Sequence, residues 1–115
     1  MSEVRLRKVE SLLKEEISLM ITKNEIKDPR LQPMAVITEV GVTKDLKYAK
    51  VYVSFYGRQE LLEHTVEALN HATGFIQGTL GKRLRLRIIP RLTFLKDTSI
   101  ERGFRVTQKL KDIFP

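Results

Sequence analysis

Cysteine is absent from this sequence of 115 residues, and the only histidines are His64 and His71. Without cysteine the chain has no disulfide framework and no thiol nucleophile. The two histidines lie seven positions apart and no third ligand is spaced to join them, so two surface histidines are favoured over a metal site. A Ser-His-Asp order with a supporting motif is also missing. We therefore expect no metal, no cofactor and no enzymatic activity.

Long hydrophobic runs are missing as well. No apolar stretch approaches the ~20 residues that are needed to span a bilayer. The N-terminal residues 1–16 (MSEVRLRKVESLLKEE) are charged throughout, unlike a signal peptide, so we expect a cytoplasmic protein. Internal repeats, low-complexity tracts and Gly/Ser linkers are absent too. The length and the 42% hydrophobic content predict one domain with a buried core.

Acidic residues are absent between Glu67 and Asp97. The cations in this window account for six of the seven net positive charges of the chain: Lys82, Arg83, Arg85, Arg87, Arg91 and Lys96. A local concentration of positive charge is typical of a protein that binds a polyanion. Nucleic acid is the leading candidate partner, and an anionic membrane is the second.

The hydrophobic pattern predicts both helices and strands. Spacings of three and four indicate helices, and a spacing of two indicates strands. The predicted helices cover residues 3–24, 58–72 and 74–86, and the predicted strands cover residues 34–43, 47–56 and 91–96. A capping pattern that begins at Thr98 predicts a C-terminal helix over residues 99–113.

The predicted order is α-β-β-α-α-β, followed by the C-terminal helix. Helices with apolar stripes must cover one face of a small sheet to bury them, so we expect the α+β class. The domain then comprises residues 1–97, and a helical extension comprises residues 98–115.

The outward side of the second predicted strand carries Tyr48, Lys50 and Tyr52. Aromatic residues combined with cations form stacking platforms for single-stranded RNA in some proteins. Ordinary cross-strand pairing, or cover by a helix, explains the same pattern more simply. We favour that simpler interpretation from the sequence.

Three glycines follow a break between two of the predicted helices. We expect an interhelical kink at Ala72, Thr73 and Gly74, because glycine costs about 1 kcal/mol against alanine inside a helix. Gly74, Gly78 and Gly81 share one helical face, along which another backbone can approach closely. From the glycines alone we expect this backbone to be the protein's own rather than that of a nucleic acid.

The basic residues beyond Gly81 are interleaved with Leu84, Leu86, Ile88 and Ile89, which we expect to attach the segment to the core. Cations held on a rigid surface are suited to phosphate contacts. Cations at the start of the first predicted helix oppose the helix dipole, which is a second, weaker indication of function. The residues expected to contact RNA are Lys82, Arg83, Arg85, Arg87, Arg91, Arg5, Arg7 and Lys8.

Four stretches of the sequence resemble the ribosome-binding factor A family, and together they span most of the chain. They are KDPR at residues 27–30, VITEVGVTKDLKYAKVYVSF at 36–55, ATGFIQGTLGKRLRLRIIPRLTF at 72–94 and DTSIERG at 97–103. The resemblance implies a type II KH-like domain of order α-β-β-α-kink-α-β, with helices covering a three-stranded sheet. KH domains clamp a nucleic-acid backbone with a GxxG loop. In this family an Ala-x-Gly kink replaces that loop, and Ala72-Thr73-Gly74 matches the kink.

The resemblance also implies a function in ribosome assembly. Members of the family bind the free 30S small ribosomal subunit, promote late maturation of 16S rRNA near its 5′ end and take part in cold adaptation. A ribosome-associated GTPase releases them. We expect this chain to act in the same way, as a monomer with no membrane partner. The residues alone indicate only a basic αβ RNA-binding domain, and they leave open a protein-interaction or translation-regulating module on the ribosome.

Overall fold

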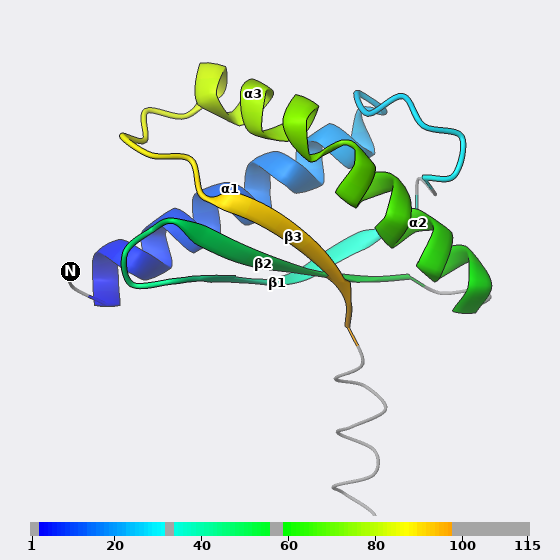
Figure 1. The fold of residues 1–115 in the computed structure, drawn as a ribbon, viewed down its shortest axis with the longest axis horizontal. Coiled ribbons are helices and arrows are strands. Elements are labelled where there is room, and N and C mark those ends of the chain that lie inside the picture. The colour runs from blue at the N-terminus through cyan, green and yellow to red at the C-terminus, as the bar shows by residue number, and fades with distance from the viewer. Residues whose placement is uncertain (1–2, 32–33, 56–58, 98–115) are drawn as a thin grey trace, which may run out of the picture.

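The computed structural model describes residues 3–31, 34–55 and 59–97. These residues form three helices and three strands in the predicted order, which confirms the α+β class (Figure 1). The elements are α1 (Glu3–Thr22), β1 (Val36–Val42), β2 (Tyr48–Ser54), α2 (Gln59–His71), α3 (Thr73–Arg83) and β3 (Arg91–Lys96). The predicted ends agree to within two residues, except at the end of α3. The predicted helix over residues 99–113 and the extension over residues 98–115 lie outside the described residues.

The three strands form one sheet in the order β1-β2-β3. β1 and β2 pair antiparallel and are joined by a hairpin, whereas β2 and β3 pair parallel. A parallel pair needs a long crossover connection, which α2 and α3 supply. Figure 1 shows all three helices on the same side of the sheet. The described part of the chain therefore consists of one layer of helices and one layer of strands.

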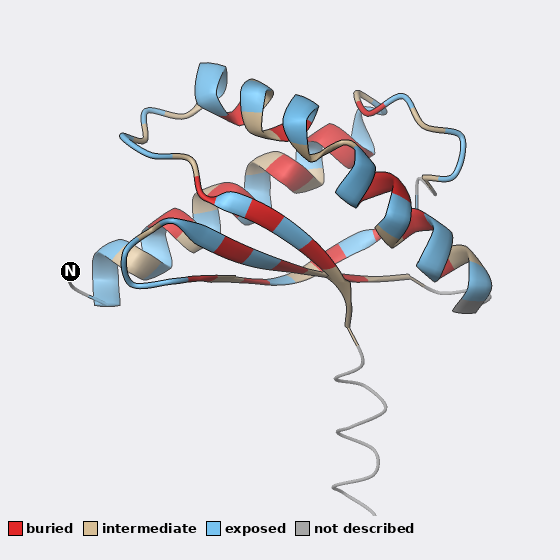
Figure 2. Cartoon of the chain, viewed as in Figure 1, coloured by how far each residue is buried: buried red, intermediate tan, exposed pale blue. Residues whose placement is uncertain are grey.

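The core lies between these two layers (Figure 2). Val51 and Val53 of the central strand are completely buried, as the two-residue period of β2 predicts. Leu13 and Ile17 of α1 are also completely buried and belong to the same apolar cluster, as does Phe94 of β3. The apolar stripe of each helix thus packs against the inner face of the sheet.

β1 departs from the two-residue period of a regular strand. Its register against β2 shifts between Ile37 and Glu39, which is the geometry of a β-bulge. Ile37 and Val40 are consequently both buried although three positions separate them, and Val42 is buried as well. The bulge keeps the apolar side chains of β1 on the core side.

The KDPR stretch between α1 and β1 forms a hydrogen-bonded turn. The Asp28 carboxylate accepts hydrogen bonds from the backbone N–H of Arg30 at 2.9 Å and from its guanidinium at 2.8 Å and 3.1 Å. These hydrogen bonds lower the pKa of Asp28 to about 2. Arg30 Nη1 also lies 3.8 Å from Glu67 Oε2 of α2. The turn therefore connects the loop after α1 to the second helix.

The outer edge of β3 is occupied by side chains of α2 and α3. The Asn70 amide donates to the backbone oxygen of Phe94 at 2.9 Å, and the backbone N–H of Phe94 donates to Asn70 Oδ1 at 2.8 Å. The backbone N–H of Leu92 donates to Gln77 Oε1 at 3.3 Å. An exposed strand edge can pair with another chain and cause aggregation. The Asn70 side chain imitates the next strand and prevents such pairing at Phe94.

Replacing Asn70 with alanine is expected to lower the free energy of unfolding by about 1–2 kcal/mol, because it leaves both backbone groups of Phe94 without their partner. Asn70→Asp is the matched variant, since it keeps the acceptor for the N–H of Phe94 and loses only the donor to the carbonyl oxygen. Urea denaturation followed by circular dichroism measures both values. An Asn70→Ala midpoint equal to that of the wild type would contradict the structural role of this pair.

Candidate nucleic-acid interface

A groove of about 690 Å³ lies between the start of α1, the hairpin that joins β1 to β2, and the segment that joins α3 to β3. Arg5 and Lys8 of α1 line it together with Arg85 and Arg87 of the segment after α3. Figure 1 shows this segment (yellow) beyond the end of α3, on the side of the N-terminal half of α1. Cations that are eighty positions apart in the sequence thus meet at one site, which we call the basic groove.

Most of the remaining lining of the basic groove is apolar. It consists of Val9, Leu12, Leu46, Leu86 and Ile88. Four positive charges around an apolar lining suit a polyanion that also presents flat, weakly polar surfaces. Nucleic acid has this composition, because its phosphates are charged and its bases are aromatic.

The position of Arg85 and Arg87 depends on where α3 ends. The helix ends at Arg83, so its predicted end at residue 86 is wrong. Leu84 has φ −103° and ψ 139°, which is an extended conformation. Leu84 and Leu86 then pack partly buried against the core, while Arg85 and Arg87 are exposed. Residues two apart share a side in an extended chain but not in a helix, so both arginines point outward because the helix has stopped.

The segment after α3 is attached to the core through part of its apolar residues. Leu84, Leu86 and Ile89 pack against the core cluster, as predicted. The same prediction is wrong for Ile88, which is 47% exposed and lines the basic groove. Pro90 is completely buried at the entrance to β3. The arginines therefore lie on a segment whose two ends are both held by the core.

The hairpin between β1 and β2 forms one wall of the groove through Asp45 and Leu46. The sequence did not indicate this wall. Leu46 has φ 62°, in the left-handed region that costs a residue with a Cβ roughly 1–2 kcal/mol. Packing of its side chain against the core cluster offsets part of that cost. A single apolar residue in the polar stretch Thr43–Leu46 is the only sequence signal for this role, and it does not reveal which distant segments it faces.

Among the residues that the structure describes, Asp45 is the one acidic residue that lines the basic groove. Its carboxylate accepts hydrogen bonds from Thr43 Oγ1 at 2.7 Å and from the backbone N–H of Lys47 at 3.0 Å. The hydrogen bond from Thr43 contributes most to lowering the pKa of Asp45, and the one from Lys47 follows. Asp45 is therefore charged at neutral pH, and its hydrogen-bonding capacity is directed to the hairpin itself.

A hydrogen bond connects the α1 side of the groove to the sheet. The backbone N–H of Val42, at the end of β1, donates to Glu10 Oε2 at 2.8 Å. Val9 and Leu13 on the neighbouring positions of α1 are buried. Because Arg5 and Lys8 belong to the same helix, these contacts also determine where the two cations lie relative to the hairpin.

Two other residues predicted to contact RNA lie around the end of α3. Arg83 Nη2 is 2.7 Å from Glu25 Oε2, and Arg83 Nη1 is 4.0 Å from Glu16 Oε2. The window that lacks acidic residues in sequence therefore has acidic neighbours in space, because α1 and the loop after it pack beside α3. Lys82 is exposed in the last turn of α3. Neither residue lines the basic groove.

The last two predicted contact residues lie on other surfaces. Arg7 lines a separate hollow together with Glu10 and Glu39. Arg91 is the first residue of β3 and pairs in register with Tyr48 of β2. Both residues are exposed. The structure thus brings together four of the eight predicted residues in the basic groove and distributes the other four over three places.

The glycine face of α3 does not pack against the protein's own backbone, so that expectation is wrong. A Cβ atom added at Gly74 or Gly78 would meet nothing within 4 Å, and one added at Gly81 would meet only Ile89 Cγ1 at 3.9 Å. α3 packs through Ile76 and Leu80, on its other side. The face with the glycines is exposed to solvent along the whole helix.

The break between α2 and α3 is a single residue. α2 ends at His71, α3 begins at Thr73, and Ala72 between them has φ −93° and ψ 9°. The backbone N–H of Ala72 donates to the oxygen of Ala68 at 3.0 Å, and its own oxygen accepts from Ile76 at 2.9 Å. The chain therefore changes direction at Ala72 without losing these backbone hydrogen bonds. Gly74 belongs to the first turn of α3.

Within the described ranges, no three His, Cys, Asp or Glu side chains are placed so that they could bind a metal ion. The helices that the structure describes are too short or too polar for any of them to cross a bilayer.

Comparison with known proteins gives a consistent family. The family described as ribosome-binding factor A matches residues 5–110 of the chain. The chain is 45% identical over 111 residues to the ribosome-binding factor A of Caldanaerobacter subterraneus. The matched region covers 96% of this chain and 90% of that protein.

Solved structures point to the same family. The crystal structure of ribosome-binding factor A from Thermus thermophilus has a TM-score of 0.66 and 31% sequence identity, and covers 79% of this chain and 94% of that one. A homology model of the Thermus thermophilus factor, fitted into a cryo-electron-microscopy map of a 30S complex of that factor, has a TM-score of 0.63 and 31% identity. It covers 76% of this chain and 90% of that one.

Replacing Gly78 with alanine is expected to stabilise the chain by about 1 kcal/mol, because glycine is the poorer residue inside a helix and the added Cβ atom meets nothing. Ile76→Ala is the comparison, because Ile76 lies on the buried side of the same helix. This variant should destabilise the chain by roughly 2–5 kcal/mol, since it removes buried atoms. Urea denaturation compares the two. A destabilised Gly78→Ala variant would show that something in the folded protein does approach this face.

Proposed function

The chain belongs to the ribosome-binding factor A family, and from this membership we propose that it is a ribosome assembly factor that binds the free 30S subunit. The basic groove is the surface that we assign to contact with 16S rRNA. The observation that carries this assignment is the meeting of Arg5, Lys8, Arg85 and Arg87 in one groove. The 30S complex of the Thermus thermophilus relative supports the choice of partner.

The contact with RNA is expected to depend on charge and shape. Phosphate contacts position a protein on a nucleic acid without reading its sequence, and folded RNA is recognised mainly by its shape and backbone. The groove offers cations on two separate segments that the core holds in place. A rigid pair of cationic edges selects an RNA backbone that follows the same path, so the protein can distinguish one folded arrangement of rRNA from another.

We further propose that the protein promotes the late maturation of 16S rRNA, including processing at its 5′ end and growth in the cold. A factor that binds an assembly intermediate more tightly than the finished subunit shifts the population between them without covalent chemistry. In this proposal the protein is a monomer and not an enzyme, it works in the cytoplasm where subunits assemble, and a ribosome-associated GTPase releases it.

The fold proposed for this function is a type II KH-like domain. The order of helices and strands is compatible with it, and the break at Ala72 lies between the two helices where KH domains carry a GxxG loop. The break is a single residue and contains no loop that could clamp a strand. We therefore place the main RNA contact in the basic groove rather than at the junction of α2 and α3.

Reversing the charge of two groove residues, with Arg85→Glu and Arg87→Glu in one chain, is expected to abolish binding to isolated 30S subunits at moderate salt. Lys14→Glu with Lys23→Glu is the control, because it makes the same change in net charge at exposed positions outside the groove. Co-sedimentation with free 30S subunits and with whole ribosomes measures binding, and circular dichroism verifies the fold.

The same experiment separates this function from a rival. A protein-interaction or translation-regulating module would bind mainly through ribosomal proteins, so its binding would survive the change at Arg85 and Arg87. Equal binding to free subunits and to whole ribosomes would also contradict a maturation factor. A nuclease is tested by incubating the protein with precursor rRNA and magnesium, where cleavage would overturn the assignment as a non-enzyme.

The salt dependence of 30S binding gives a quantitative measure of the groove. If the four groove cations each contact a phosphate, the logarithm of the affinity should fall with the logarithm of the salt concentration at a slope of roughly −3 to −4. Arg85→Ala with Arg87→Ala should reduce that slope by roughly half, since counterion release scales with the number of contacts. A slope near zero for the wild type would exclude an electrostatic interface.

A further inference from the structure

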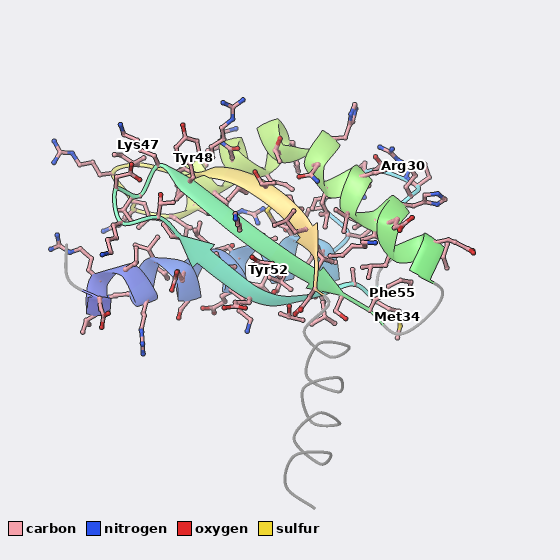
Figure 3. The ribbon with its side chains drawn as sticks, turned by 60° about the horizontal axis from the view of Figure 1, so that its bottom comes forward. Arg30, Met34, Lys47, Tyr48, Tyr52 and Phe55 are labelled. Carbon is pink, nitrogen blue, oxygen red and sulfur yellow. The ribbon has the colours of Figure 1, made fainter. Side chains whose placement is uncertain are left out.

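The outer face of the sheet carries a hollow that is separate from the basic groove. Tyr48, Lys50 and Tyr52 alternate along β2 with buried residues, so they point away from the helices. Figure 3 shows this side of the molecule, with Tyr48 and Tyr52 labelled along the same strand. No helix of the described residues covers this face, and Tyr48 is 55% exposed. Cover by a helix, which the sequence suggested as one explanation, is therefore not found within the described ranges.

The hollow lies over the middle of the sheet, at the hairpin end. It has a volume of about 440 Å³, and its lining includes Gly41 of β1, Tyr48 and Lys50 of β2 and Thr93 of β3. In the register of the sheet, Lys50 lies between Gly41 on one side and Thr93 on the other. Small residues thus flank the lysine, and the tyrosine ring lies next to them along β2.

Gly41 is not required by the fold. Its φ lies outside the left-handed range that favours glycine, and a Cβ atom added there would meet nothing within 4 Å. Glycine inside a strand weakens the strand, and it often marks a place where a ligand comes close. Neither backbone conformation nor packing explains this glycine, whereas an occupant of the hollow would.

The charge around the hollow is positive. Lys50 lines it, and Arg91 pairs in register with Tyr48 at its border. Lys47, one position before Tyr48, is exposed as well. Two carboxylates lie on the surrounding segments. Asp45 of the hairpin accepts a hydrogen bond at 2.7 Å from Thr43, which lines the hollow, and Glu39 of β1 is paired with Tyr52 further along the sheet. A cationic surface with an exposed aromatic ring at Tyr48 complements a single-stranded nucleic acid better than an apolar peptide.

We propose that the outer face of the sheet binds a single-stranded segment of RNA. One base stacks on the ring of Tyr48 and occupies the hollow above Gly41 and Thr93, and Lys50 and Arg91 contact the phosphates on either side. This second site is independent of the basic groove, since the two share no lining residue. It gives a role to Arg91 and to the exposed Tyr48, which lie apart from the basic groove.

Fluorescence anisotropy of a labelled ten-nucleotide oligouridine tests the proposal on the full chain at about 0.15 M salt, where surface charges far from the site are largely screened. Tyr48→Ala should weaken binding on the order of tenfold, because stacking of one base is lost. Tyr48→Phe keeps the ring and should bind like the wild type. Gly41→Val fills the hollow and should weaken binding to a similar degree as Tyr48→Ala.

Gly41→Val also provides the control for folding. A β-branched residue suits a strand and a Cβ atom at position 41 meets nothing within 4 Å, so the urea midpoint of Gly41→Val should equal or exceed that of the wild type. Lost oligouridine binding in a chain of unchanged stability can then only come from the filled hollow. Equal weakening by Tyr48→Phe and Tyr48→Ala would mean that the hydroxyl group, and not stacking, matters, and would overturn the proposal.

The groove variant distinguishes this inference from the proposed function. Arg85→Glu with Arg87→Glu should lose 30S binding and retain oligouridine binding, while Gly41→Val should lose oligouridine binding. Unchanged affinity in both Gly41→Val and Tyr48→Ala, or no binding of oligouridine by the wild type, overturns the sheet site and leaves the groove untouched. A wild-type dimer that Gly41→Val converts to a monomer would also overturn it, because a second copy of the chain would then be the occupant.

Discussion

The parallel pairing of β2 with β3 determines the arrangement of the rest of this molecule. β2 is the central strand, and its side chains at Val51 and Val53 are completely buried. To place β3 parallel beside it, the chain must return from the end of β2 to the level of its beginning. α2 and α3 make this return across the inner face of the sheet, and the segment before β3 completes it. Because Arg91 pairs with Tyr48, that segment arrives beside the hairpin and the start of α1.

The basic groove is a consequence of this return path. The cations after α3 could face the groove only if the helix stopped early, and the alternation of Leu84 and Leu86 with Arg85 and Arg87 shows that it does. In the extended conformation both leucines pack, partly buried, against the core cluster, and apolar burial is the dominant favourable term in folding. A strained hairpin residue, Leu46, completes the wall. The site is therefore assembled from three segments that have little in common in sequence.

The same topology leaves the two faces of the sheet with different tasks. The inner face takes up the apolar stripes of three helices, and the outer face keeps polar and aromatic side chains in solvent among the described residues. Side-chain hydrogen bonds at the edges have structural roles: Asn70 and Gln77 bind the backbone at the edge of β3, and Glu10 holds α1 to the end of β1. The path of the chain thus determines which face of the sheet is covered by helices and which side chains bind its two edges.

The periodicity of apolar residues was sufficient to predict the helices and strands. Apolar residues recur every three or four positions in helices and every two positions in strands, and the core residues follow these spacings. This periodicity predicted the order of helices and strands and the inward side of β2, and the local excess of positive charge indicated a polyanion. Periodicity failed at the end of α3. There the helix stops at Arg83, and Leu84 and Leu86 pack in an extended segment against core residues from other parts of the chain. The sequence by itself also misplaced the glycine face, and it did not show which of the eight predicted cations lie together. Only the tertiary structure decided which cations meet, which are paired with acidic residues and which lie on the sheet, because those relations depend on contacts between segments far apart in the chain.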